Sequence, residues 1–179
     1  MLTTDNSVLL LVDIQGKLAH SMHAKESLFQ NLKKLVKGMR VLEIPILWAE
    51  QNPRGLGPTV PEIADLLPDL EPIPKNSFSC HANNEIRQAL ENLNRPNVLV
   101  AGIETHVCVY QTVRDLAKAT YSVQLVADAV SSRTIENKQI GLEKCKHTGA
   151  EITSVETALF ELLKVAEGDR FKMILDVIK

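Results

Sequence analysis

Short apolar runs alternate with segments of helical periodicity along the chain. Val8–Val12 and Val98–Ala101 are unbroken apolar runs, typical of strands buried on both faces of a sheet. Between Leu28 and Leu42, apolar residues recur every three or four positions, which predicts an amphipathic helix. The other expected elements are a strand over 45–48, a loop over 50–61, an extended segment around Lys75, a helix over 86–93 capped by Asn83 or Asn84, a helix after Gly102, strands over 122–127 and 151–153, and helices over 135–147, 155–162 and 171–178.

This alternation predicts an α/β fold with a central parallel sheet covered by helices on both faces. In such a sheet, ligands bind beyond the carboxyl ends of the strands, at the point where the strand order reverses. Polar residues directly after a buried strand are therefore the first candidates for a functional site.

Length and composition narrow the class of protein. The 179 residues, 45% of them hydrophobic, predict a single domain over 1–179 with a substantial core. The net charge of −2 and the pI near 6.2, without a basic run, favour neither nucleic acid nor a membrane surface as partner. The N-terminal stretch lacks the pattern of a signal peptide, and the longest apolar run is too short to span a bilayer.

Three cysteines, without CxxC spacing, predict neither a disulfide scaffold nor a structural zinc site. We therefore expect a reducing compartment and a cytoplasmic location. Cys80 and Cys145 are interpreted as structural, whereas Cys108 falls in the first turn of the helix expected after Gly102. A helix N-terminus lowers the pKa of a thiol, so Cys108 is a candidate nucleophile. The alternative is a packed apolar side chain, which is the commoner state of a free cysteine.

Asp13 follows the first apolar run and is the second candidate. If its strand neighbours the strand before Cys108, the carboxylate and the thiol share one site and the carboxylate can take the thiol's proton. The alternative role for Asp13 is to cap the segment that begins at Ile14.

Several motifs in chain order resemble the isochorismatase-like cysteine hydrolases: VDIQ at 12–15, PKNSFS with Lys75 at 74–79, and GIETHVCV at 102–109. A second set resembles the small isochorismatase domain-containing proteins in particular: EQNPRGLGPTVPE at 50–62, KNSFS at 75–79, GIETHVC at 102–108 and DAVSSR at 128–133. The resemblance spans nearly the whole chain. It implies a doubly wound, Rossmann-like, three-layer sandwich with about six parallel strands.

The resemblance also implies a catalytic triad. Cys108 is the nucleophile, Asp13 the general base, and Lys75 the cation that holds both. A cis peptide bond between Ile103 and Glu104 is implied as well, with the backbone N–H groups of Glu104 and Cys108 as an oxyanion hole. The reaction would be hydrolysis of an amide or related C–N bond of a small carbonyl compound through a thioester.

Residues that flank the triad positions are candidates for the substrate pocket, with capping, packing or surface roles as the alternative: Gln15, Gln51, Phe78 and His106. The nicotinamidase branch of the family binds a metal after the second strand, where this chain has Trp48, Ala49, Glu50 and Gln51 without a histidine. We therefore expect neither a metal nor another cofactor. The family resemblance favours a homo-oligomer, a dimer or a tetramer, and a small-molecule substrate.

Two other classes of function stay open from the sequence. One is a binding or regulatory protein that keeps the fold and the triad with little turnover. The other is a redox-active thiol protein in which Cys108 is oxidised reversibly, although no resolving cysteine is evident.

Overall fold

A six-stranded parallel sheet forms the centre of the molecule. In the computed structural model, which describes residues 1–179, the strand order is β3-β2-β1-β4-β5-β6. The strands are β1 (Ser7–Val12), β2 (Ile46–Gln51), β3 (Ile73–Lys75), β4 (Asn97–Ile103), β5 (Ser122–Ser131) and β6 (Glu151–Thr153). The chain builds outward from β1 to β3 and then returns to the other side of β1 with β4, so the order reverses between β1 and β4. This confirms the predicted doubly wound sheet.

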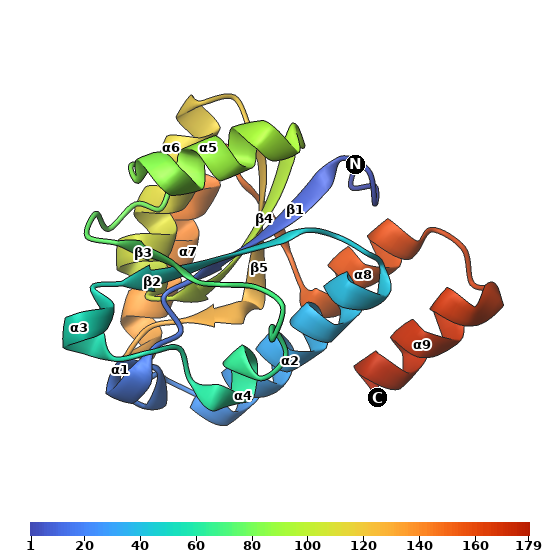
Figure 1. Ribbon diagram of the computed structural model, residues 1–179, viewed down its shortest axis with the longest axis horizontal. Coiled ribbons are helices and arrows are strands. Elements are labelled where there is room, and N and C mark those ends of the chain that lie inside the picture. The colour runs from blue at the N-terminus through green and yellow to red at the C-terminus, as the bar shows by residue number, and fades with distance from the viewer.

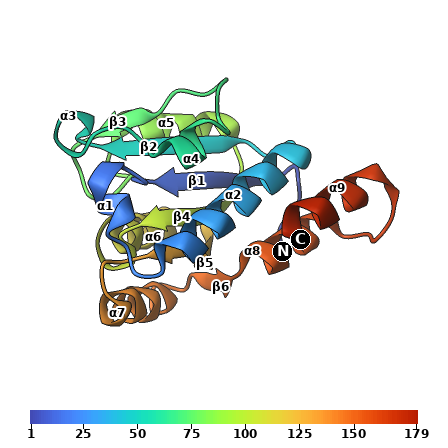
Figure 2. The same ribbon diagram turned by 90° about the horizontal axis from the view of Figure 1, so that it is seen from below.

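Helices cover both faces of the sheet (Figures 1 and 2). They are α1 (Gly16–His20), α2 (Lys25–Val41), α3 (Pro53–Leu56), α4 (Pro61–Ala64), α5 (Asn84–Leu93), the π-helical turn η1 (Thr105–Val109), α6 (Tyr110–Lys118), α7 (Ile135–Lys146), α8 (Val155–Leu163) and α9 (Gly168–Ile178). None of them combines the length and the apolar character needed to cross a lipid bilayer.

Two hydrophobic clusters, one on each face, hold the three layers together. The larger contains 29 buried residues and packs α2 and α8 against the sheet, and α9 packs on α2 and α8. The smaller contains 18 buried residues and packs α5 and α6 on the opposite face. Every residue of β1 and β4 is buried, because successive side chains of a central strand enter the two clusters alternately. Burial on both faces of the sheet explains why the sequence of these strands is continuously apolar.

The structure differs from the expected elements around β2 and β5. Glu50 and Gln51 belong to β2, the short helix α3 lies within the expected loop, and α4 begins at its last residue, Pro61. The strand expected to stop before Asp128 continues to Ser131. Its pairing with β4 shifts in register after Val100 and resumes where Gly102 pairs with Val130. This extension carries the end of β5 to the edge of the candidate site.

Candidate active site

Asp13 and Cys108 follow β1 and β4, the two strands at which the order reverses. Val12 pairs with Gly102, so the ends of the two strands lie side by side. Asp13 adopts a left-handed conformation with φ of 52°, and Gly102 has φ of 119°. A side chain at Gly102 would place its Cβ 2.1 Å from the Val12 carbonyl oxygen. The glycine therefore permits the close approach that brings the two candidate residues together.

An ion pair at the end of the sheet joins Asp13 to Lys75, the last residue of β3. Lys75 Nζ donates to Asp13 Oδ2 at 2.7 Å, and the two side chains are 0% and 2% exposed. The ammonium also donates to Gln51 Oε1 at 2.7 Å and lies 3.1 Å from the carbonyl oxygens of Ser77 and Phe78. Its hydrogen-bonding capacity is filled, so Lys75 is fixed in place.

The second carboxylate oxygen of Asp13 is free. Asp13 Oδ1 is buried and has no hydrogen-bond partner. Burial raises the pKa of Asp13 above its usual value, and this effect outweighs the opposing attraction of Lys75. Asp13 does not act as the helix cap considered as its alternative, because α1 begins at Gly16 with Gln15 as the capping residue. The Asp13 side chain lies close enough to Cys108 for each group to affect the pKa of the other.

Cys108 lies in η1, a wide π-helical turn, and not in the first turn of an α-helix as expected. The carbonyl oxygen of Glu104 accepts from the N–H of Val109, five residues later, at 3.2 Å, and the α-helix α6 begins only at Tyr110. The Cys108 side chain belongs to the smaller hydrophobic cluster and is 8% exposed.

The expected lowering of the Cys108 pKa is wrong in direction. Burial raises the pKa of the Cys108 thiol, and the negative charge of Asp13 raises it further, against a smaller opposing effect of Lys75. The raised pKa favours the protonated, thiol form of Cys108. Nucleophilic attack by the Cys108 sulfur would therefore need a base that receives the thiol proton.

Contacts with Arg133 and Gly141 fix the position of the turn before Cys108. The peptide bond between Ile103 and Glu104 is cis, and the N–H of Glu104 makes no hydrogen bond. Glu104 Oε1 accepts from the backbone N–H of Arg133 at 3.2 Å and from its Nε at 3.1 Å. Gly141 of α7 lies so close to η1 that a Cβ would be 2.6 Å from the carbonyl carbon of Thr105. No local sequence pattern indicates the roles of Gly141 and Arg133, because both depend on contacts with a distant segment.

Three of the expected pocket residues have structural partners, and one is exposed. Gln15 is fully buried and ties two segments together: its Nε2 donates to the carbonyl oxygens of Gln51 and Gly57, and its Oε1 accepts from the N–H of Gln51. His106 Nδ1 lies 3.0 Å from Ser132 Oγ. Phe78 is 54% exposed next to the lysine and is free to contact a bound molecule. Gln51 belongs to the lysine's hydrogen-bond shell.

Trp48 and Glu50, which lie where the nicotinamidase branch binds its metal, are both hydrogen-bonded to Thr59. Trp48 Nε1 donates to Thr59 Oγ1 at 2.8 Å, and Glu50 Oε1 accepts from the N–H and the hydroxyl of the same threonine. No group of three His, Cys, Asp or Glu side chains is placed to hold a metal ion. These side chains join β2 to the loop before α4.

The family model described as "Isochorismatase domain" matches residues 7–157. The chain belongs to the isochorismatase family. The secreted isochorismatase effector Isc1 of Phytophthora sojae (strain P6497) is 37% identical, over 97% of this chain and 85% of its own length. Isochorismatase domain-containing protein 2 of Danio rerio is 35% identical, over 97% of this chain and 87% of its own length.

A solved structure gives the same overall arrangement. The MAR1 ribonuclease from Caenorhabditis elegans superposes with a TM-score of 0.92 at 32% identity, covering 99% of this chain and 91% of that one. The isochorismatase family and its fold support a hydrolase.

Proposed function

We propose that this isochorismatase-family protein hydrolyses an amide or related C–N bond of a small carbonyl compound through a thioester on Cys108. The observation that carries the proposal is the Asp13 carboxylate, with one oxygen held by Lys75 at 2.7 Å and the other without a partner. A carboxylate that is fixed and still able to accept a proton is what a buried thiol nucleophile requires.

The first half of the reaction forms the thioester. The Cys108 thiol gives its proton to Asp13 Oδ1 as its sulfur bonds to the carbonyl carbon. The negative charge that develops on the carbonyl oxygen is met by the N–H groups of Glu104 and Cys108. When the intermediate collapses, the C–N bond breaks and the proton on Asp13 passes to the leaving nitrogen.

The second half returns the enzyme to its resting state. Water attacks the thioester while Asp13 takes one of its protons, and the acid is released as the C–S bond breaks. The proton then returns to the Cys108 sulfur. Burial of Asp13 suits this cycle, because a raised pKa lets the carboxyl hold a proton between the two transfers. Lys75 keeps Asp13 in position throughout through its hydrogen bond to Oδ2.

The redox alternative has less support. Oxidation to a sulfenic acid begins from the thiolate, and the raised pKa of Cys108 opposes its formation. Cys80 shares the smaller hydrophobic cluster with Cys108, but burial raises the pKa of Cys80 to about 12. A cytoplasmic location, a homo-oligomeric state and the absence of a cofactor stay predictions.

The test combines a panel of small amides with mass spectrometry of the intact protein. We expect a hydrolysed amide to leave a transient acyl adduct on Cys108, Cys108→Ala to abolish turnover, and Asp13→Asn to slow it by about 10² to 10⁴-fold. Cys145→Ala removes a buried cysteine outside the triad and should retain activity.

Activity retained in Cys108→Ala would contradict the covalent mechanism. The panel should also include a short RNA, because the name of the 32% identical Caenorhabditis elegans protein is that of a ribonuclease. RNA cleavage that survives Cys108→Ala, with no amide hydrolysed, would replace the proposal with phosphodiester chemistry. Binding of amides without turnover would favour the regulatory alternative.

A further inference from the structure

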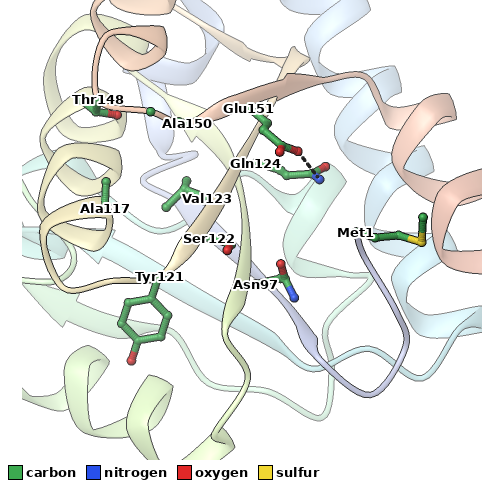
Figure 3. A pocket seen from close by; sticks show the side chains of 11 residues that line it. Met1, Asn97, Ala117, Tyr121, Ser122, Val123, Gln124, Thr148, Ala150 and Glu151 are labelled. Atoms are coloured by element: carbon green, nitrogen blue, oxygen red, sulfur yellow. Dashed lines mark hydrogen bonds between the residues drawn. The ribbon is translucent and has the colours of Figure 1, made fainter.

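Residues 131–133, the end of the motif DAVSSR, lie beside the turn that carries Cys108. β5 runs the length of the sheet: its first residue, Ser122, lines a hollow at the amino ends of the strands (Figure 3), and its last residue, Ser131, pairs with Ile103 at the carboxyl ends. Because Ser131 and Ile103 are paired, the residues that follow them leave the sheet side by side. The proposed reaction uses none of the residues 131–133.

The segment 131–133 is anchored to a second part of the chain, the loop between α1 and α2. The N–H of His23 in this loop donates to the carbonyl oxygen of Ser132 at 2.8 Å, and Ser131 Oγ donates to the carbonyl oxygen of His23 at 2.7 Å. Both serines are buried. The segment is thus held in place independently of the turn that it contacts.

Glu104 is the residue at which the turn meets this segment. Its carbonyl oxygen accepts from the N–H groups of Val107 and Val109, at 3.0 and 3.2 Å, inside the turn. Its Oε1 accepts from the backbone N–H and from Nε of Arg133, at 3.2 and 3.1 Å. The Glu104 side chain is 10% exposed and the Arg133 side chain 59%. The guanidinium therefore holds a nearly buried carboxylate from the solvent side by a charge-assisted hydrogen bond.

A second contact joins the turn to the same segment. His106 Nδ1 lies 3.0 Å from Ser132 Oγ, within hydrogen-bonding distance. The turn is thus tied at Glu104 and at His106 to two neighbouring residues of one anchored segment. An ion pair with an exposed arginine contributes little to folding stability. The main consequence of the pair between Glu104 and Arg133 is therefore where Glu104 lies.

We propose that Arg133 is a positioning residue for the oxyanion hole. By holding the Glu104 carboxylate, the guanidinium keeps the backbone N–H of Glu104 in place to donate to the oxygen on which charge develops. The inference rests on the proposed function, in which this N–H and that of Cys108 are the two donors. Such donors act because they are aligned before the reaction begins, and loss of one costs about 10²–10³-fold in rate. Loss of Arg133 leaves the donor present but less firmly held, so its effect is smaller.

The experiment measures two properties of Cys108 in one competition assay. Methyl methanethiosulfonate has no carbonyl group, so its rate of labelling reports the reactivity of the thiol alone. Acetaldehyde and benzaldehyde compete with it, because the sulfur bonds to the carbonyl carbon and the thiol proton passes to the carbonyl oxygen. That oxygen then lies where the oxyanion would form. The aldehyde concentration that halves labelling of the Cys108 peptide, quantified by mass spectrometry, reports how well the oxyanion hole is arranged.

Three variants of the full-length protein test the role of the guanidinium. Arg133→Ala should raise the half-maximal aldehyde concentration about fivefold or more and leave labelling without aldehyde unchanged, because only the oxyanion donor is disturbed. Arg133→Lys keeps a cationic donor for Glu104 and should stay within about twofold of wild type. Arg170→Ala is the matched control, because Arg170 in α9 is 53% exposed and pairs with Glu43 at 2.7 Å, outside the site. It should match wild type.

Unchanged competition by the aldehydes in Arg133→Ala would overturn the inference. A parallel change in labelling without aldehyde would also overturn it, because looser packing around the thiol would then explain the result. Failure of both aldehydes to slow the labelling of wild type would instead contradict the proposed function, because Cys108 would not add to a carbonyl group.

Discussion

Asp13 has an environment that no local sequence pattern describes. It is bonded to a lysine two strands away, its free oxygen has no partner, and its charge acts on the Cys108 thiol. Burial is the largest cause of the raised pKa at both Asp13 and Cys108. The Asp13 charge opposes ionisation of the Cys108 thiol, whereas the thiol, as a hydrogen-bond donor, favours the ionised form of Asp13.

The first prediction is that Asp13→Asn makes Cys108 more reactive toward iodoacetamide. After burial, the Asp13 charge is the main cause that raises the Cys108 pKa, so its removal increases the thiolate fraction at a given pH. We expect alkylation at pH 8 to become about tenfold faster, since one pKa unit changes that fraction tenfold. The rate is measured by mass spectrometry of the Cys108 peptide.

Cys145 provides the internal control for this measurement. Burial alone raises its pKa, to about 12, so its labelling should not respond to the substitution at Asp13. Unchanged labelling of Cys108, or an equal increase at Cys145 caused by loosening of the fold, would contradict the proposed coupling between thiol and carboxylate.

At the scale of elements, the site depends on the junction of β4 with η1. The strand must end beside Val12 and the turn must pack against α7. Gly102 and Gly141 allow these two approaches, because a Cβ at either position would lie less than 3 Å from backbone atoms. A Cβ added at either glycine would force the neighbouring backbone to move. Backbone atoms, unlike a side chain, cannot relieve such a contact by changing rotamer.

The second prediction is that Gly102→Ala destabilises the fold by about 3 kcal/mol or more. The new Cβ would lie 2.1 Å from the Val12 carbonyl oxygen, and φ of 119° is strained for any L side chain. Gly168→Ala is the matched control, because Gly168 has φ of 82° with nothing within 4 Å of its Cβ. The control should cost about 1 kcal/mol from backbone strain alone. Urea unfolding measures both, and equal losses would contradict the steric argument.

At the scale of the whole molecule, the three layers bury all three cysteines. Cys145 lies in the smaller cluster with no exposed surface, and its pKa is raised from 9.0 to about 12. Between these two pH values the unfolded chain loses a proton that the folded chain keeps. The unfolded state is then favoured as the pH rises, so this thiol lowers the free energy of unfolding above pH 9.

The third prediction compares wild type with Cys145→Ala between pH 8 and 10.5. Above pH 9, the free energy of unfolding of wild type should fall more steeply, by up to about 1.4 kcal/mol per pH unit. Below pH 8 the two proteins should differ by a constant amount that reflects packing alone. Urea unfolding at each pH gives the curves, and parallel curves over the whole range would contradict the assigned pKa.

The sequence by itself determined the layers, the order of the elements and the candidate triad. A central parallel strand must be apolar on both faces, so Val8–Val12 and Val98–Ala101 identified the middle of the sheet. Asp13, directly after the first run, marked the edge at which a functional site is expected. Family motifs added Lys75, which periodicity alone did not connect with Asp13.

Only the tertiary structure decided the electrostatics of the site. The expected low pKa of Cys108 came from its place along the chain, whereas burial and the Asp13 charge, both products of packing, set the opposite direction. The free oxygen of Asp13 likewise depends on which partners the strands bring near. Periodicity reports which face of an element is buried, but desolvation and unpaired hydrogen-bonding groups arise from contacts between segments distant in sequence.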